Sequence, residues 1–270
     1  MRKLEIDEIK KIELEILKTI SEFCDSNHLK YYLTYGTLLG AVRHKGFIPW
    51  DDDIDINMPR NDYDRLQTLL KNQHFLFNEY TELKTPDSKS YQYQFLKVFD
   101  NRTIVYEKNM KKKYKASVWI DIFPLDKLPE EKKKQNAFMS KLLKMRKYYF
   151  YTIEKKFSGN STFGNIKYSI IKFIMTPIYF LINQKKRIAK YARKYINKNT
   201  KYVFFSLNGD SYKTIFEDNI LEQTDIIFED YKFTTFKNYD KVLTQLYGDY
   251  MQLPPPEKRV LAHSLTAYWK

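Results

Sequence analysis

The chain has almost no cysteine: Cys24 is the only one in 270 residues. A single thiol excludes an intrachain disulfide and a zinc site built from cysteines, so we expect a reducing, cytoplasmic compartment. Residues 1–11 lack the apolar core of a secretory signal, so we expect no export. The most apolar stretch, residues 168–183, is shorter than the roughly 20 residues of a spanning helix and contains Lys172 and Pro177. We therefore expect no transmembrane segment.

Acidic side chains are fewer than basic ones, with 33 Asp and Glu against 47 Lys and Arg, for a net charge of +14. Such a surface attracts an anionic partner, which leaves nucleic acid, a membrane leaflet and a phosphate-bearing substrate as alternatives. The hydrophobic content of 43% indicates a folded protein, and 270 residues allow one large domain or two small ones.

Periodic patterns predict the elements of the N-terminal part. Apolar side chains recur at three- and four-residue steps in residues 4–25, which predicts an amphipathic helix. Residues 30–35 predict a strand, followed by a turn at Gly36 and a short helix that Thr37 caps. Residues 53–56 alternate aspartate and isoleucine with the two-residue period of a strand.

Further along, Asn61 is placed to cap another helix. A pair of strands is expected at residues 91–99 and 103–107, joined by a turn. Residues 117–123, with the sequence SVWIDIF, predict a strand on which Asp121 lies on the opposite face from the two isoleucines beside it.

The rest of the chain changes in character. Residues 129–157 and 165–199 are helical and strongly basic, separated at residues 158–161 (SGNS). A strand near residues 202–207, a strand near 231–236 and a helix near 238–247 follow. We therefore predict an α+β fold, in which a mixed sheet is flanked by helices and interrupted by a basic helical insertion. The predicted parts are a core at residues 1–128, an insertion or subdomain at 129–200, and a C-terminal part at 201–270 that completes the core and the substrate site.

Four aspartates occupy five positions around Ile54, namely Asp51, Asp52, Asp53 and Asp55. Carboxylates this close repel one another, whereas a bound divalent cation accepts several of their oxygens at once. On a strand, Asp53 and Asp55 share one face, and Asp51 has the same parity, so these three are candidate ligands of Mg²⁺ or Mn²⁺. Asp52 is expected to face away and to pair with a surface cation. The alternative is a solvated acidic loop, which would not need the alternating isoleucines.

Other candidate site residues flank this cluster. Gly36 and Thr37 offer backbone N–H groups and a hydroxyl at a helix start, where phosphate oxygens bind, although a glycine in a tight turn is the alternative. Arg43 and Lys97 could neutralise donor phosphates, or could be solvated surface charges. Asp121 is the third carboxylate of the predicted site, as a metal ligand or as the base for an attacking hydroxyl, unless it is a charge at a strand edge.

Long motifs resemble those of the LicD family, which is related to fukutin within the nucleotidyltransferase superfamily. They are residues 35–44 (YGTLLGAVRH) and 46–56 (GFIPWDDDIDI), Lys97 before 100–103 (DNRT), 120–126 (IDIFPLD), and the tail from 247–251 (YGDYM) through 253–255 (LPP) to His263. The resemblance covers residues 4 to 269 and is weakest in the helical middle.

The resemblance implies a nucleotidyltransferase-like core and a magnesium-dependent phosphotransferase. Such enzymes transfer phosphocholine from CDP-choline to a sugar of a lipid-linked precursor of teichoic acid, capsule or lipopolysaccharide. By the same pattern Asp53 and Asp55 match the metal-binding pair, Asp121 the third acidic position, and Gly36 and Thr37 the donor-phosphate turn. Relatives that transfer glycerol or ribitol phosphate leave the alcohol open.

A choline group needs an aromatic cage, because it cannot donate a hydrogen bond. Tyr35, Trp50, Trp119 and Trp269 are candidates, each with core packing as the alternative. His263 is a candidate contact to the substrate, with a structural hydrogen bond as the alternative. The rival functions are a nucleotidyltransferase that acts on a small molecule or RNA, and a non-enzymatic basic binding module. We expect no nucleic acid partner. The basic helical region is a candidate for resting on the anionic inner face of the cytoplasmic membrane, with a plain packed helix as the alternative.

Overall fold

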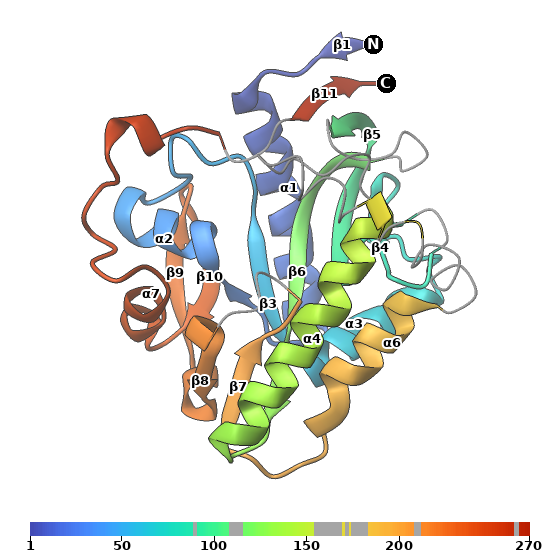
Figure 1. Ribbon diagram of the computed structural model, residues 1–270. Coiled ribbons are helices and arrows are strands. Elements are labelled where there is room, and N and C mark those ends of the chain that lie inside the picture. The colour runs from blue at the N-terminus through green and yellow to red at the C-terminus, as the bar shows by residue number, and fades with distance from the viewer. Residues whose placement is uncertain are drawn as a thin grey trace.

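A curled mixed sheet carries helices on both faces in the computed structural model, so the fold is α+β, as predicted (Figure 1). The structure describes residues 1–88, 91–107, 116–153, 169–170, 173, 183–207, 212–261 and 265–270. The main strand order is β1 (Arg2–Lys3), β11 (Leu265–Trp269), β5 (Leu96–Glu107), β6 (Ala116–Leu128), β3 (Asp55–Pro59) and β2 (Tyr32–Leu33). The neighbours β3 and β6 are parallel, whereas the other pairs along this order are antiparallel.

The remaining strands extend the sheet at its sides. Strand β4 (Thr81–Lys84) pairs with β5, and β7 (Tyr202–Phe205) joins β6 to β8 (Ile215–Glu217). A separate hairpin consists of β9 (Gln223–Phe228) and β10 (Tyr231–Phe236). The two chain termini meet, because β1 and β11 are paired at one edge of the sheet (Figure 1).

Two hydrophobic cores hold helices to the sheet. The first contains the apolar faces of α1 (Ile6–Ser26) and α3 (Arg60–Lys71). The second contains those of α4 (Lys132–Ile153) and α6 (Gln184–Ala192), which run side by side (Figure 1). On β6, Ile122 belongs to the first core and Phe123 to the second, so the two cores lie on opposite faces of the sheet. Both cores contain residues far apart in sequence.

Helices α2 (Tyr35–His44) and α7 (Tyr239–Tyr247) lie beside the β9–β10 hairpin, where they border the acidic segment that precedes β3 (Figure 1). Among the helices that the structure describes, none combines the length and the apolar character needed to cross a bilayer.

The structure corrects three local predictions. Helix α2 begins at Tyr35, with Thr34 as N-cap residue, because the Thr37 hydroxyl accepts a hydrogen bond from the Asp55 N–H instead of capping the helix. Helix α3 begins at Arg60, so Asn61 lies inside it and is not its cap. The expected strand 53–56 begins only at Asp55.

The hairpin expected within residues 91–107 is also wrong. This segment contains one strand, β5, whose register with β6 shifts between Asp100 and Val105. The Asp100 side chain accepts hydrogen bonds from the Arg102 backbone and guanidinium, and the Thr103 hydroxyl donates to the Asp100 carbonyl. The turn-forming residues therefore make a local irregularity in a strand that continues through them.

The helix at residues 4–25, the strand at 117–123, the strand at 231–236 and the helix near 238–247 are confirmed, within a few residues at their ends. Much of the basic region predicted as helix after residue 153 lies outside the described residues, although α6 falls within it. The division of the chain at residues 128 and 200 stays a prediction.

Candidate active site

Three predicted acidic residues come together where β3 and β6 lie side by side. Asp55 is in register with Asp121 across the parallel pair, and the Asp121 N–H donates to the Ile54 carbonyl at 2.9 Å. Carboxylate oxygens of Asp53, Asp55 and Asp121 all lie within 4.8 Å of one another. Three converging carboxylates are the donor set that Mg²⁺ and Mn²⁺ prefer, so these residues fit a divalent cation.

The electrostatics of this cluster also favour a cation. Burial raises the pKa of Asp55 well above its ordinary value, and the neighbouring carboxylates of Asp53, Asp121 and Asp51 raise it further, against the opposing effect of Lys97. Without another positive charge, the cluster therefore costs free energy when it is fully ionised. A bound cation would reverse this effect.

A second acidic group continues from the first. Asp51, Asp52 and Asp53 also have oxygens within 4.8 Å of one another, and Asp52 is buried. The expected surface position of Asp52 is thus wrong: burial alternates through residues 51–56, and Asp52 lies on the buried side with Ile54 and Ile56. Glu13 of α1 is also buried. Burial, and then the charges of Asp53, Asp52 and Asp51, raise the pKa of Glu13 well above its ordinary value.

Gly36 allows α2 to approach this acidic segment closely. A Cβ atom at Gly36 would lie 2.3 Å from Asp51 Oδ2, so any larger residue would push the carboxylate away. The absence of a side chain at Gly36 thus lets α2 lie close to the Asp51 carboxylate. The predicted contact of Gly36 with a donor phosphate stays a prediction.

Lys97 contacts the cluster through Asp121. Its Nζ lies 2.7 Å from Asp121 Oδ1, and it lies 4.0 Å from the ring centroid of Trp119 and 4.4 Å from that of Tyr93. Lys97 is only 3% exposed, so it is a buried partner of the third carboxylate and not a surface charge. Trp119 packs against this ammonium, away from the pocket described below.

Two other predicted donor-binding groups are engaged elsewhere. Thr37 is buried, and its hydroxyl fixes the backbone of Asp55 at 2.8 Å. The Arg43 guanidinium donates to the Tyr250 carbonyl at 2.8 Å and to His44 Nε2 at 3.0 Å. In this structure both residues support neighbours of the pocket, and their contact with a donor phosphate stays a prediction.

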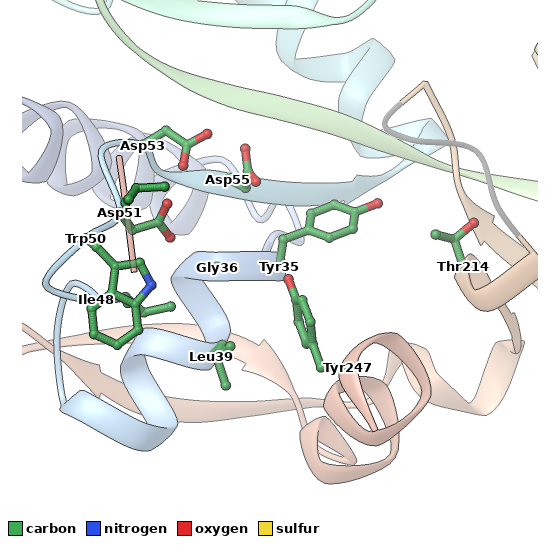
Figure 2. Close-up of a pocket in the computed structure, with 11 residues that line it drawn as sticks. Tyr35, Gly36, Leu39, Ile48, Trp50, Asp51, Asp53, Asp55, Thr214 and Tyr247 are labelled. Carbon is green, nitrogen blue, oxygen red and sulfur yellow. The ribbon is translucent and has the colours of Figure 1, made fainter. Parts of the chain in front are cut away.

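A pocket of about 370 Å³ opens beside the carboxylates (Figure 2). Of the predicted residues, Tyr35, Gly36, Trp50, Asp51, Asp53 and Asp55 line it. The other lining residues are Leu39, Ile48, Thr214, Tyr247 and Val260. The pocket therefore combines carboxylates with aromatic and apolar walls, a combination suited to a charged group joined to a less polar one.

Tyr247 and Thr214 were not predicted as site residues. Tyr247 ends α7 and is partly exposed, but desolvation of its hydroxyl, followed by the charges of Asp55, Asp51 and Asp53, raises the pKa of that hydroxyl. The tail motif at 247–251 is the sequence signal that contains it, whereas we see no signal for Thr214. Trp269 lies on β11 against Arg102, outside this pocket, and His263 lies outside the described residues.

Comparison with known proteins gives a consistent result. Residues 28–163 match the family model described as the LicD/FKTN/FKRP nucleotidyltransferase domain. The chain is 32% identical to lipopolysaccharide cholinephosphotransferase LicD of Haemophilus influenzae over 280 aligned positions, covering 99% of both chains. It is also 30% identical to an uncharacterized protein of Rickettsia prowazekii, over 60% of this chain and 65% of that one.

Proposed function

The chain belongs to the LicD family, and on that premise we propose that it transfers phosphocholine from CDP-choline to a sugar of a lipid-linked cell-surface glycan precursor, releasing CMP. The acceptor would be a precursor of lipopolysaccharide, teichoic acid or capsule. The observation that carries the proposal is the convergence of Asp53, Asp55 and Asp121 beside a pocket with aromatic walls. The full-length similarity to a lipopolysaccharide cholinephosphotransferase supports the choice of phosphocholine and of a glycan acceptor.

Asp53, Asp55 and Asp121 would hold Mg²⁺ or Mn²⁺, which when bound neutralises charge on the donor diphosphate. The sugar hydroxyl would attack the phosphorus next to choline in line with the bond to CMP. Lys97 contacts Asp121 Oδ1 and keeps the carboxylate oriented, and Asp121 would serve the cation or accept the hydroxyl proton. Asp121 would act as a metal ligand if a carboxylate oxygen faces the cation, and as a base if it faces the acceptor hydroxyl.

The choline group would lie against the aromatic wall. The side chains of Tyr35, Trp50 and Tyr247 all line the pocket that contains Asp51 and Asp55 (Figure 2). A quaternary ammonium binds to aromatic faces and is further attracted by nearby carboxylates. Glycerol and ribitol phosphate, the alternative groups, carry no such charge, so CDP-glycerol should compete weakly against CDP-choline.

The direct test is the identity of the products formed from CDP-choline and a purified lipid-linked acceptor. Our proposal expects CMP and a phosphocholine-bearing glycan, detected by mass spectrometry. Release of pyrophosphate from a nucleoside triphosphate, with no reaction of CDP-choline, would instead identify the alternative, a nucleotidyltransferase acting on a small molecule or RNA.

The cation can be tested without substrate. We expect Mg²⁺ at about 100 times its Kd to raise the Tm by roughly 5–10 °C, since binding to the folded state alone contributes about 2.7 kcal/mol.

The pKa of Asp55 is raised in the folded state. Without a cation, the folded state is therefore destabilised as the pH rises from the ordinary pKa of this carboxyl through its raised pKa, because the group must then ionise where its charge is disfavoured. Asp55→Asn should therefore raise the cation-free Tm at pH 8 and abolish the response to Mg²⁺. A variant that kept the full response would exclude Asp55 as a ligand.

We also propose that the enzyme acts in the cytoplasm, with α4 resting on the anionic inner leaflet that holds its acceptor. Six lysines are exposed on this helix: Lys132, Lys133, Lys134, Lys141, Lys144 and Lys147. Each basic residue near such a surface contributes about 1 kcal/mol. Sedimentation with vesicles containing phosphatidylglycerol should remove the protein from solution at low salt, and failure to do so would contradict this contact.

A further inference from the structure

A second pocket, of about 570 Å³, lies between α3, α6 and the segment before β5. We call it the basic pocket. Its basic lining residues are Arg60, Lys185, Lys186, Lys190 and Arg193. Arg60 directly follows β3 and Asp126 lies near the end of β6. Each is five residues beyond Asp55 or Asp121, a spacing of roughly 16 Å along a strand. The basic pocket is therefore separate from the acidic cluster.

Carboxylates balance some of these charges. Asp126 accepts two hydrogen bonds from Arg60, Asp64 pairs with Arg193, and Asp87 lies 3.4 Å from Lys186. Two of the five cations remain, Lys185 and Lys190, and neither has a carboxylate within ion-pair distance among the described residues. The pocket therefore keeps a positive charge after its own ion pairs are made.

Lys185 is held inward by two backbone carbonyls. Its ammonium donates to the backbone carbonyls of Ser88, at 2.8 Å, and Tyr91. Burial lowers the pKa of Lys185 to about 8, against the opposing effect of Asp87. An anion in the pocket would offset this cost of burying a positive charge.

Gln94 adds a donor of a different kind. It is only 2% exposed and lines the pocket, and its Oε1 accepts a hydrogen bond from Arg146 Nε at 2.9 Å. Because a guanidinium can only donate, this bond fixes the amide orientation and leaves Nε2 as the free donor. Within the part of the chain that the structure describes, Gln94 Nε2 has no hydrogen-bond acceptor. An acceptor supplied by a ligand would satisfy it after a small shift of the pocket floor.

From these observations we propose that the basic pocket is a second binding site, specific for a phosphate-bearing molecule. Lysine, arginine and amide donors are the groups that bind phosphate oxygens in proteins. The volume exceeds what a bare phosphate ion fills and suits a phosphorylated sugar. This site does not depend on the proposed transfer reaction, since its residues lie outside the acidic cluster.

Isothermal titration of the full chain with inorganic phosphate and with a hexose phosphate tests the proposal. We expect both to bind, and the hexose phosphate at least about tenfold more tightly, since its sugar fills the remaining volume. Equal affinities for inorganic phosphate and the hexose phosphate would mean that the basic pocket binds free phosphate and does not recognise the sugar. Binding of neither ligand at millimolar concentration would overturn the proposal.

Two variants locate the binding. Gln94→Glu keeps the acceptor for Arg146 and replaces the amide donor by a negative oxygen, so we expect at least about a tenfold loss of affinity. Lys190→Gln, on an exposed part of α6 where misfolding is not at issue, should lose about threefold to tenfold. Arg187→Gln removes the same charge from α6 outside the pocket and should change nothing. Unchanged binding in both pocket variants would refute this location.

The catalytic cluster gives an independent control. Asp55→Asn should bind the hexose phosphate as the unmodified chain does, even if it transfers no phosphocholine. A loss of binding in Asp55→Asn alone would place the ligand in the acidic cluster and overturn the second site. Failure of the transfer assay with intact hexose phosphate binding would affect only the proposed function.

Discussion

Asp53→Asn and Asp55→Asn are each expected to lower the rate of phosphocholine transfer from CDP-choline by about 10²- to 10³-fold. Each change removes one negative oxygen from a group whose carboxylates lie within 4.8 Å of one another. An electrostatic contact made at the reacting phosphate is worth about 3–4 kcal/mol, and about 1.4 kcal/mol corresponds to tenfold in rate. The measurement is release of CMP under saturating donor, with Mg²⁺ titrated for each variant.

The control for this prediction is Asp225→Asn. Asp225 lies on β9, is exposed and pairs with Lys232, so its loss should leave transfer within about twofold. If both cluster variants kept full activity at every Mg²⁺ concentration, the three carboxylates would not be the catalytic centre. Recovery at high Mg²⁺ would instead show a weakened metal site that still supports the reaction.

The sequence pattern was sufficient to select the three acidic residues whose carboxylates converge in the structure, whereas their role in catalysis stays a prediction. The spacing of Asp53 and Asp55 indicated a shared side, and Asp121 stood out in an apolar strand. What brings Asp121 to Asp55 is the parallel pairing of β3 with β6, whose partners are 66 residues apart in sequence. No local sequence pattern specifies such a pair. Asp121 could be selected from the sequence only because it is a charged residue within an otherwise apolar strand.

The errors also have physical causes. The residues Asp100 and Asn101 have the composition of a turn, but the pairing of β5 with β4 and β6 on its two sides outweighs that local preference. Thr37 has the side chain of a helix cap, but its hydroxyl accepts the Asp55 N–H from another segment. Likewise, Tyr247 reaches the pocket only because α7 packs beside α2. In each case a contact between distant segments decides the outcome.

Lys97→Met is expected to destabilise the fold by about 3–5 kcal/mol and to lower transfer by at least about 100-fold. The change leaves the Asp121 carboxylate without its partner at 2.7 Å, in a place where Asp121 is only 8% exposed. It also removes the cation that packs on Trp119 and Tyr93. Urea unfolding in Mg²⁺-free buffer measures the first effect, and CMP release measures the second.

Lys84→Met is the matched control, because Lys84 lies opposite Lys97 in the register of β4 and β5 and also pairs with a carboxylate, that of Glu82. That pair is partly exposed, so its loss should cost at most about 1 kcal/mol. The double variant Lys97→Met with Asp121→Asn removes the unpaired charge and should regain most of the stability but none of the activity. Equal losses for Lys97→Met and Lys84→Met would mean that Lys97 contributes packing alone, whereas recovery of transfer in the double variant would exclude Asp121 from the reaction.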